Sequence, residues 1–133
     1  MLRWAGATAD IVGVNASIHS GEIDADAALD ALPDRIDEKV GWVREGAGDR
    51  FEDLELNAWL AAAEVTDDPS MVETMAALFG TDPESFSRSP LALVGSAGDV
   101  AEMLAERRER WGYSYHVIPG DKAHDFAPLV ASL

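Results

Sequence analysis

The chain of 133 residues carries 10 Lys and Arg against 25 Asp and Glu, a formal net charge of −15, and 47% of its residues are hydrophobic. This length and composition fit one globular domain over residues 1–133. Nucleic acids and anionic membrane surfaces need clustered basic residues, so the charge argues against both partners. The chain has no cysteine, which excludes disulfides and thiolate-bound metals, and we predict no metal site.

Apolar patterning predicts three elements in the first third of the chain. Residues 2–8 have the character of a helix end, and the short β-branched run at 10–16 predicts a buried strand. After a polar loop at 17–32, a helix is predicted from position 34, with Lys39 on its solvent side. Its apolar face is formed by Ile36, Val40 and Val43.

The middle of the chain predicts one long strand over residues 53–65, although the alanines at 61–63 leave a helix as the alternative. Apolar residues at even positions from 54 to 60 alternate with polar residues and with Trp59, which therefore lies opposite the leucines. Helices are predicted to begin near Pro69 and Pro83, each just after a capping signal.

The last third begins with an extended run at 91–95, followed by a helix capped by Ser96 and Asp99 and ended by Gly112. A strand at 113–118 and a final helix at 125–133 complete the prediction. The helix ending at Gly112 carries a basic cluster that we expect to be exposed and paired with Glu106 and Glu109. The cluster consists of Arg107, Arg108 and Arg110.

This alternation of strands and helices predicts an α/β fold with a parallel sheet. Three main strands cannot close a barrel, so two sheet edges are left open. We expect Leu56, Leu60 and Val117 to face outward on such a sheet. Because exposed apolar faces are rare on monomers, the sequence predicts a homodimer or a larger assembly.

No common catalytic or phosphate-binding motif is present in the chain. His19 and His116 follow or end predicted strands and can meet at one end of the sheet. An acid–base or ligand role for His116 competes with the simpler interpretation of a strand histidine that hydrogen-bonds a neighbour. Most paired carboxylates stand at helix starts, where they favour the helix dipole.

Several stretches, in the same order and spacing, resemble the C-terminal part of luciferase-like monooxygenases, most closely their actinobacterial branch. The first of them reads LRWAGATADIVG, and another reads RRERWGYSY. The stretches that carry the resemblance lie at 2–13, 38–51, 53–57, 89–96, 107–115 and 126–131.

That resemblance implies a partial (β/α)8 TIM-barrel fragment of about three parallel βα units, because whole barrels need about 250 residues. It implies a cytoplasmic oxidoreductase that transfers hydride between the deazaflavin coenzyme F-420, or FMN, and a small organic substrate. The family's glycine-rich phosphate loop and first strands match nothing in this chain, which begins at Met1. No catalytic residue is carried over, and we expect the isolated chain to be inactive.

Barrel enzymes place their chemistry at the carboxyl ends of the strands. In this chain the residues near those ends that we predict to line a pocket are Asn15, Ser17 and His116. Their alternative role is ordinary loop hydrogen bonding. The competing function is a non-enzymatic α/β remnant that acts through self-association or through a partner chain.

Overall fold

The computed structural model describes residues 1–18, 21 and 24–133. Its strands are β1 (Ile11–Gly13), β2 (Glu55–Trp59), β3 (Ala62–Val65), β4 (Ala92–Gly95) and β5 (Tyr113–Val117). Its α-helices are α1 (Leu2–Thr8), α2 (Ala25–Asp30), α3 (Pro33–Ala47), α4 (Ser70–Leu78), α5 (Pro83–Arg88), α6 (Ala97–Trp111) and α7 (Ala123–Val130). Two 3-10 helices, η1 (Gly48–Asp53) and η2 (Gly120–Lys122), precede β2 and α7.

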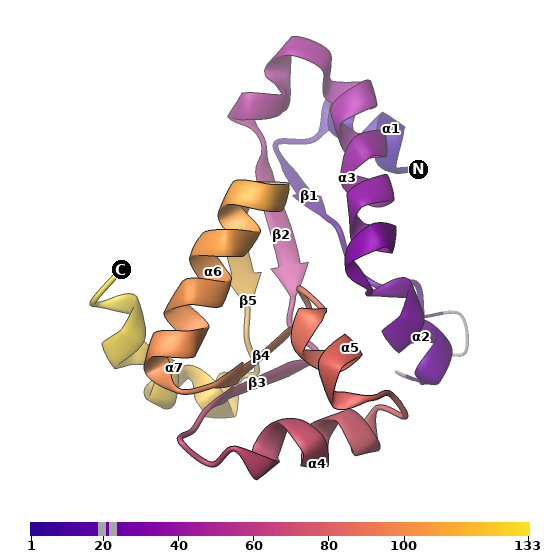
Figure 1. Cartoon of the computed structure of the whole chain (residues 1–133). Helices are drawn as coiled ribbons and strands as arrows, with labels where there is room; N and C mark the ends of the chain where they lie inside the picture. The colour runs from indigo at the N-terminus through magenta and orange to yellow at the C-terminus, as the bar shows by residue number, and fades with distance from the viewer. Residues whose placement is uncertain (19–20, 22–23) are drawn as a thin grey trace.

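The strands form two small parallel sheets, which confirms the predicted α/β class (Figure 1). The first sheet has the order β1-β2-β5, with Val12 beside Leu56 and Leu56 beside Tyr113. The pairing with β5 is irregular between Leu56 and Asn57, so that Asn57 pairs with Tyr115. The second sheet consists of β3 and β4 alone.

The prediction of a single strand over residues 53–65 is wrong, because the chain changes sheets at Leu60 and Ala61. The Leu60 N–H donates to the Val117 carbonyl at 2.9 Å, and the Ala61 N–H donates to the Leu91 carbonyl at 2.8 Å. Ala62 and Ala63 are both buried, so β3 is covered on its two faces. A strand covered on both faces loses the alternating pattern, which is why the alanines gave a weak signal.

Helices α3 and α6 cover one face of the β1-β2-β5 sheet (Figure 1). Leu56 and Leu60 lie in this core with exposures of 1%, so the expectation that they face outward is wrong. The apolar stripe of α3 needs an apolar sheet face to pack on, and the leucines supply it. The opposite face, called here the open sheet face, presents Ile11, Glu55, Asn57, Trp59, Tyr115 and Val117.

A second core joins the β3-β4 sheet to the helices α4 and α5. It contains the buried residues Ala62, Ala76, Phe86, Ala92 and Val94, with Met71, Val72, Met75 and Phe79 packed against them. The rings of Phe79 and Phe86 stack with centroids 5.8 Å apart. Residues of β3 and β4 that point the other way join the first core, so the two cores share this small sheet.

The ends of α6 follow the sequence signals closely. Ser96 and Asp99 form the predicted capping box, in which each side chain bonds the other residue's backbone N–H. Gly112 ends the helix with a φ of 83°, in the left-handed region that favours glycine. Within the part of the chain that the structure describes, no helix combines the length and apolar character needed to cross a bilayer.

Candidate functional site

An apolar crevice lies where β1 and β2 end, beside the switch between the two sheets. Its cavity volume is about 230 Å³. Three alanines form part of the wall, and Trp59 from the end of β2 is its largest side chain. The lining residues are Asn15, Ala16, Ile18, Ala27, Trp59, Ala61 and Leu91. In parallel α/β sheets, ligands bind at this end of the strands.

Asn15, a predicted pocket residue, lines the crevice and also holds its shape. Its side-chain Oδ1 accepts a hydrogen bond of 2.7 Å from the Trp59 backbone N–H. A Cβ atom at Gly13 would lie 3.0 Å from the Asn15 Nδ2, so the absence of a side chain there leaves room for the amide. The asparagine therefore joins the ends of β1 and β2.

Ser17 is fixed by its backbone rather than directed into the crevice. Its N–H donates to the Asp30 carboxylate at 2.8 Å. Asp30 also accepts from Lys39, whose ammonium further donates to the carbonyls of Asn15 and Asp30. Burial alone would raise the Asp30 pKa, but the hydrogen bonds from Lys39 and Ser17 outweigh it and lower the pKa to about 2.

The prediction that Lys39 lies on the solvent side of its helix is therefore wrong. Lys39 is only 4% exposed, and its ammonium reaches under the loop that follows β1. Three acceptors compensate for the loss of water around the charge. This lysine thus fixes the backbone of Asn15 at the mouth of the crevice.

His116 lies on the other face of the sheet from the crevice wall formed by Trp59. It pairs with Ala58, which is fully buried, and its ring lies 6.1 Å from that of Tyr113. The buried Nε2 atom has no hydrogen-bond partner among the described residues. Burial, assisted by the charge of Arg107, lowers the His116 pKa to about 4. Its possible partner His19 falls outside the described residues.

His116 is expected to make the fold less stable in mild acid. The unfolded chain takes up a proton near pH 6.5, whereas the folded chain resists it until about pH 4. Stability is therefore lost as the pH falls through this interval. We expect wild type to lose about 1 to 2 kcal/mol more unfolding free energy than His116→Gln over this interval. The difference is no larger because the histidine is only partly buried.

Urea denaturation of both proteins at neutral pH and near the lower pKa measures this difference. The matched control is His124→Gln, because His124 is exposed on α7. Wild-type and His116→Gln curves that stay parallel across the interval would contradict a buried, neutral histidine.

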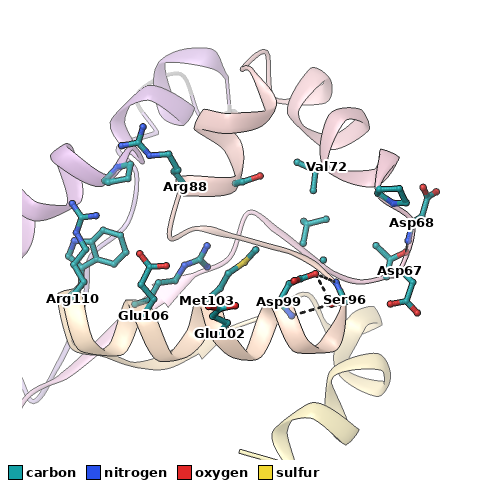
Figure 2. Close-up of a pocket in the computed structure, with 18 residues that line it drawn as sticks. Asp67, Asp68, Val72, Arg88, Ser96, Asp99, Glu102, Met103, Glu106 and Arg110 are labelled. Atoms are coloured by element: carbon teal, nitrogen blue, oxygen red, sulfur yellow. Dashed lines mark hydrogen bonds between the residues drawn. The ribbon is translucent and has the colours of Figure 1, made fainter.

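A larger groove, of about 640 Å³, runs along α6 on the side of α4 and α5. Figure 2 shows Asp67, Asp68 and Asp99 near one end of it and Arg88 and Arg110 near the other. Hydrogen bonds from Ser70 and Ser96 lower the pKa values of Asp68 and Asp99, respectively. These two carboxylates are therefore ionised hydrogen-bond acceptors near helix starts at neutral pH and do not serve as proton donors.

The arginines of α6 are not the uniform exposed cluster that the sequence predicted. Arg107 is 3% exposed and donates to the carbonyls of Ser89, Pro90 and Ala92 at 2.7 to 3.2 Å. Burial lowers the Arg107 pKa to about 10. Arg110 instead donates two hydrogen bonds to the Asp37 carboxylate on α3.

A third hydrogen bond strengthens this contact between α3 and α6. The Trp111 indole N–H donates to the same Asp37 carboxylate at 2.6 Å. Hydrogen bonds from Arg110 and Trp111 lower the Asp37 pKa. Arg107 and Arg110, the arginines by which α6 lines the groove, thus both have structural partners.

The geometry brings together Asn15 and Trp59 but leaves Ser17 and His116 outside the crevice lining. Trp59 was missed as a pocket residue, although an aromatic side chain at the carboxyl end of a strand was a usable signal. Among the described residues, no three histidines or carboxylates are placed to hold a metal ion. The crevice can therefore bind an apolar or aromatic group, but its described lining residues include no proton-transfer pair.

Comparisons with known proteins add nothing to this geometry. No protein-family model, curated protein or solved structure matches the chain.

Proposed function

We propose that this chain is the C-terminal part of a cytoplasmic luciferase-like oxidoreductase, a class that transfers hydride between a reduced flavin or deazaflavin and a small organic substrate. One observation carries the proposal. β1, β2 and β5 are parallel neighbours in chain order, with helices on one face and a nearly uncharged open face. A segment of TIM-barrel wall has this arrangement, with its inner face turned toward the barrel axis. The crevice at the strand ends supports the same interpretation.

The described residues of the crevice fit the planar ring of the implied coenzyme but not its phosphate. Trp59 presents an aromatic surface suited to stacking with a planar ring. Among the residues that the structure describes, no Lys or Arg lines the crevice, and its volume of about 230 Å³ is below that of most small-molecule sites. The phosphate of FMN or F-420 therefore finds no cation here, and no catalytic step is assigned to these residues.

Ring binding at Trp59 is tested by fluorescence titration with FMN, F-420 and lumiflavin, which carries the flavin ring without a phosphate. We expect saturable quenching in the micromolar range, similar for FMN and lumiflavin because the phosphate has no partner. Trp59→Ala should weaken binding at least about tenfold, given the contribution of aromatic stacking. The matched control is Trp4→Ala, since Trp4 is 72% exposed on α1.

Absence of saturable binding up to millimolar ligand would contradict the oxidoreductase proposal. So would binding that is equal in wild type and Trp59→Ala, because the ring would then lie elsewhere. Either result would leave self-association as the better account of the open sheet face.

The isolated chain is expected to show no turnover. Positioning and electrostatic stabilisation supply most of the catalytic effect of enzymes, and the described part of the crevice lining supplies neither a phosphate site nor a proton-transfer pair. The measurement is spectroscopic oxidation or reduction of each coenzyme with a panel of organic substrates. Turnover that disappears in Asn15→Ala or His116→Gln would contradict this expectation.

The second candidate function is a non-enzymatic α/β remnant that acts through self-association. The open sheet face favours it, because Ile11, Trp59 and Tyr115 are 51%, 43% and 44% exposed on the same face of three paired strands. Large apolar side chains exposed on one face are typical of interaction sites on proteins.

A further inference from the structure

The groove along α6 lies at the carboxyl ends of the second parallel sheet. Thr66 and Asp67 directly follow β3, Ser96 directly follows β4, and all three line the groove. Ligands of parallel α/β sheets bind at such strand ends. The groove volume of about 640 Å³ also lies within the range of small-molecule sites. Position and size therefore favour a ligand here on grounds other than charge.

The middle of the groove has an apolar lining. Val72 comes from α4, Val94 from β4 and Met103 from α6. Val94 is buried, whereas Val72 and Met103 are half-buried and open to the groove. Figure 2 shows Val72 and Met103 on opposite walls, between the acidic end and Arg88. Such a lining favours a ligand with an aliphatic segment, because contact removes apolar area from water.

Carboxylates dominate the charged part of the lining. They belong to Asp67, Asp68, Asp99, Glu102 and Glu106. Within the described chain, the carboxylates of Asp67 and Glu102 have no hydrogen-bond or ion-pair partner. Arg107 and Arg110 already bond other groups of the protein, and Arg88 stands at the far end. Charge complementarity therefore selects a cationic ligand.

We propose that the groove binds a linear aliphatic polyamine, a chain of ammonium groups joined by short runs of methylene groups. Asp99, Glu102 and Glu106 stand three and four residues apart on α6, so they share one side of the helix. Their positions rise along the helix axis by about 4.5 and about 6 Å. Ammonium groups separated by three or four methylene groups have a similar spacing, and the methylene groups contact Met103 and Val72.

The apolar contacts distinguish this site from the acidic surface as a whole. A net charge of −15 draws any cation toward the chain. At physiological ionic strength that attraction is screened beyond about 8 Å. Binding that persists in such salt therefore depends on contacts within the groove, and a metal cation has no methylene groups to make them.

Isothermal titration calorimetry with spermidine, in about 0.15 M salt and without coenzyme, tests the proposal. We expect one saturable site in the micromolar range. The double variant Glu102→Gln, Glu106→Gln should bind at least about fivefold more weakly, because two ion pairs are lost. The matched control is Glu52→Gln, Glu73→Gln, which makes the same charge change at exposed positions outside the groove lining.

The apolar contact is tested by Met103→Gln with two probes. This variant should weaken spermidine binding and leave the weaker binding of magnesium unchanged, since the charges of the groove are retained. Equal affinity of wild type for spermidine and magnesium would overturn the proposal, because charge alone would then explain binding. Absence of saturable binding up to millimolar spermidine would overturn it as well.

Equal affinity of wild type and the Glu102, Glu106 double variant would place the ligand elsewhere and also contradict the proposal. If that variant does not fold, as judged by circular dichroism, Asp67→Asn provides the same test from the loop after β3. It should weaken binding at least about twofold, and an unchanged affinity would exclude the groove. Among the described residues the groove and the crevice share no lining residue, so this titration and the coenzyme titration fail independently.

Discussion

Replacing Arg107 with alanine is expected to lower the free energy of unfolding by about 3 to 5 kcal/mol. The guanidinium is 3% exposed and donates to three carbonyls around the turn between α5 and β4. Without it, the carbonyls of Ser89, Pro90 and Ala92 lose a charged donor, and a cavity opens beneath α6. Urea denaturation of wild type and variant measures the difference.

Two further variants separate the causes of that loss. Arg108→Ala removes an exposed arginine from the next position of the same helix and should change stability by less than about 0.5 kcal/mol. Arg107→Lys keeps the charge but lacks the planar fork that spans several carbonyls, so an intermediate loss is expected. A loss below about 1 kcal/mol in Arg107→Ala would show that the three hydrogen bonds contribute little net stability.

Lys39→Met is expected to cost about 2 to 4 kcal/mol, because the variant leaves buried acceptors without their donor. The ammonium of Lys39 bonds the carbonyl of Asn15 at 2.9 Å, the carbonyl of Asp30 at 3.0 Å and the Asp30 carboxylate. The emission of Trp59 should change as well, since Asn15 joins the loop to the backbone of Trp59. Denaturant melts and the emission spectrum are the two measurements.

The variant should also change the response to acid. Asp30 has a folded-state pKa of about 2 against an ordinary value of 3.8, so it stabilises the fold above pH 3.8 and loses this effect as the pH falls toward 2. Without Lys39 the pKa of Asp30 rises, and acid should stabilise the variant relative to wild type in this interval. Arg35→Ala is the matched control, because Arg35 is an exposed second partner of Asp30. An equal loss of stability in both variants would contradict a special role for the buried lysine.

The burial of Arg107 and Lys39 was not predicted from the sequence. Hydrophobic spacing and capping signals predicted the helices and most strands, because such signals are local. The same basic residue at the same helical spacing can end in water or beneath a loop, and the acceptors of Arg107 are all backbone carbonyls. Carbonyls leave no mark in a sequence, so the burial of Arg107 and Lys39 was not predictable.

The candidate site shows a related limit. Alternation in residues 54–60 predicted two different faces of β2, and Trp59 does lie opposite Leu56 and Leu60. The pattern did not specify which face the helices cover, because that depends on the apolar stripe of α3 and on the crossover to α6. Asn15 was predicted from its place after β1, whereas its bond to Trp59 required the register of the paired strands.

The change of sheets at Leu60 and Ala61 has a consequence for the order of folding. The unit from β3 to β4 pairs residues only 30 positions apart, such as Ala62 with Ala92. The other sheet must bring Val12 to Leu56 and Leu56 to Tyr113, across separations of 44 and 57 positions. Because closing a longer separation costs more chain entropy, we expect the β3-β4 unit to form first. We then expect β5 to complete the larger sheet, and pulse-labelling hydrogen exchange should find its amide protons protected last.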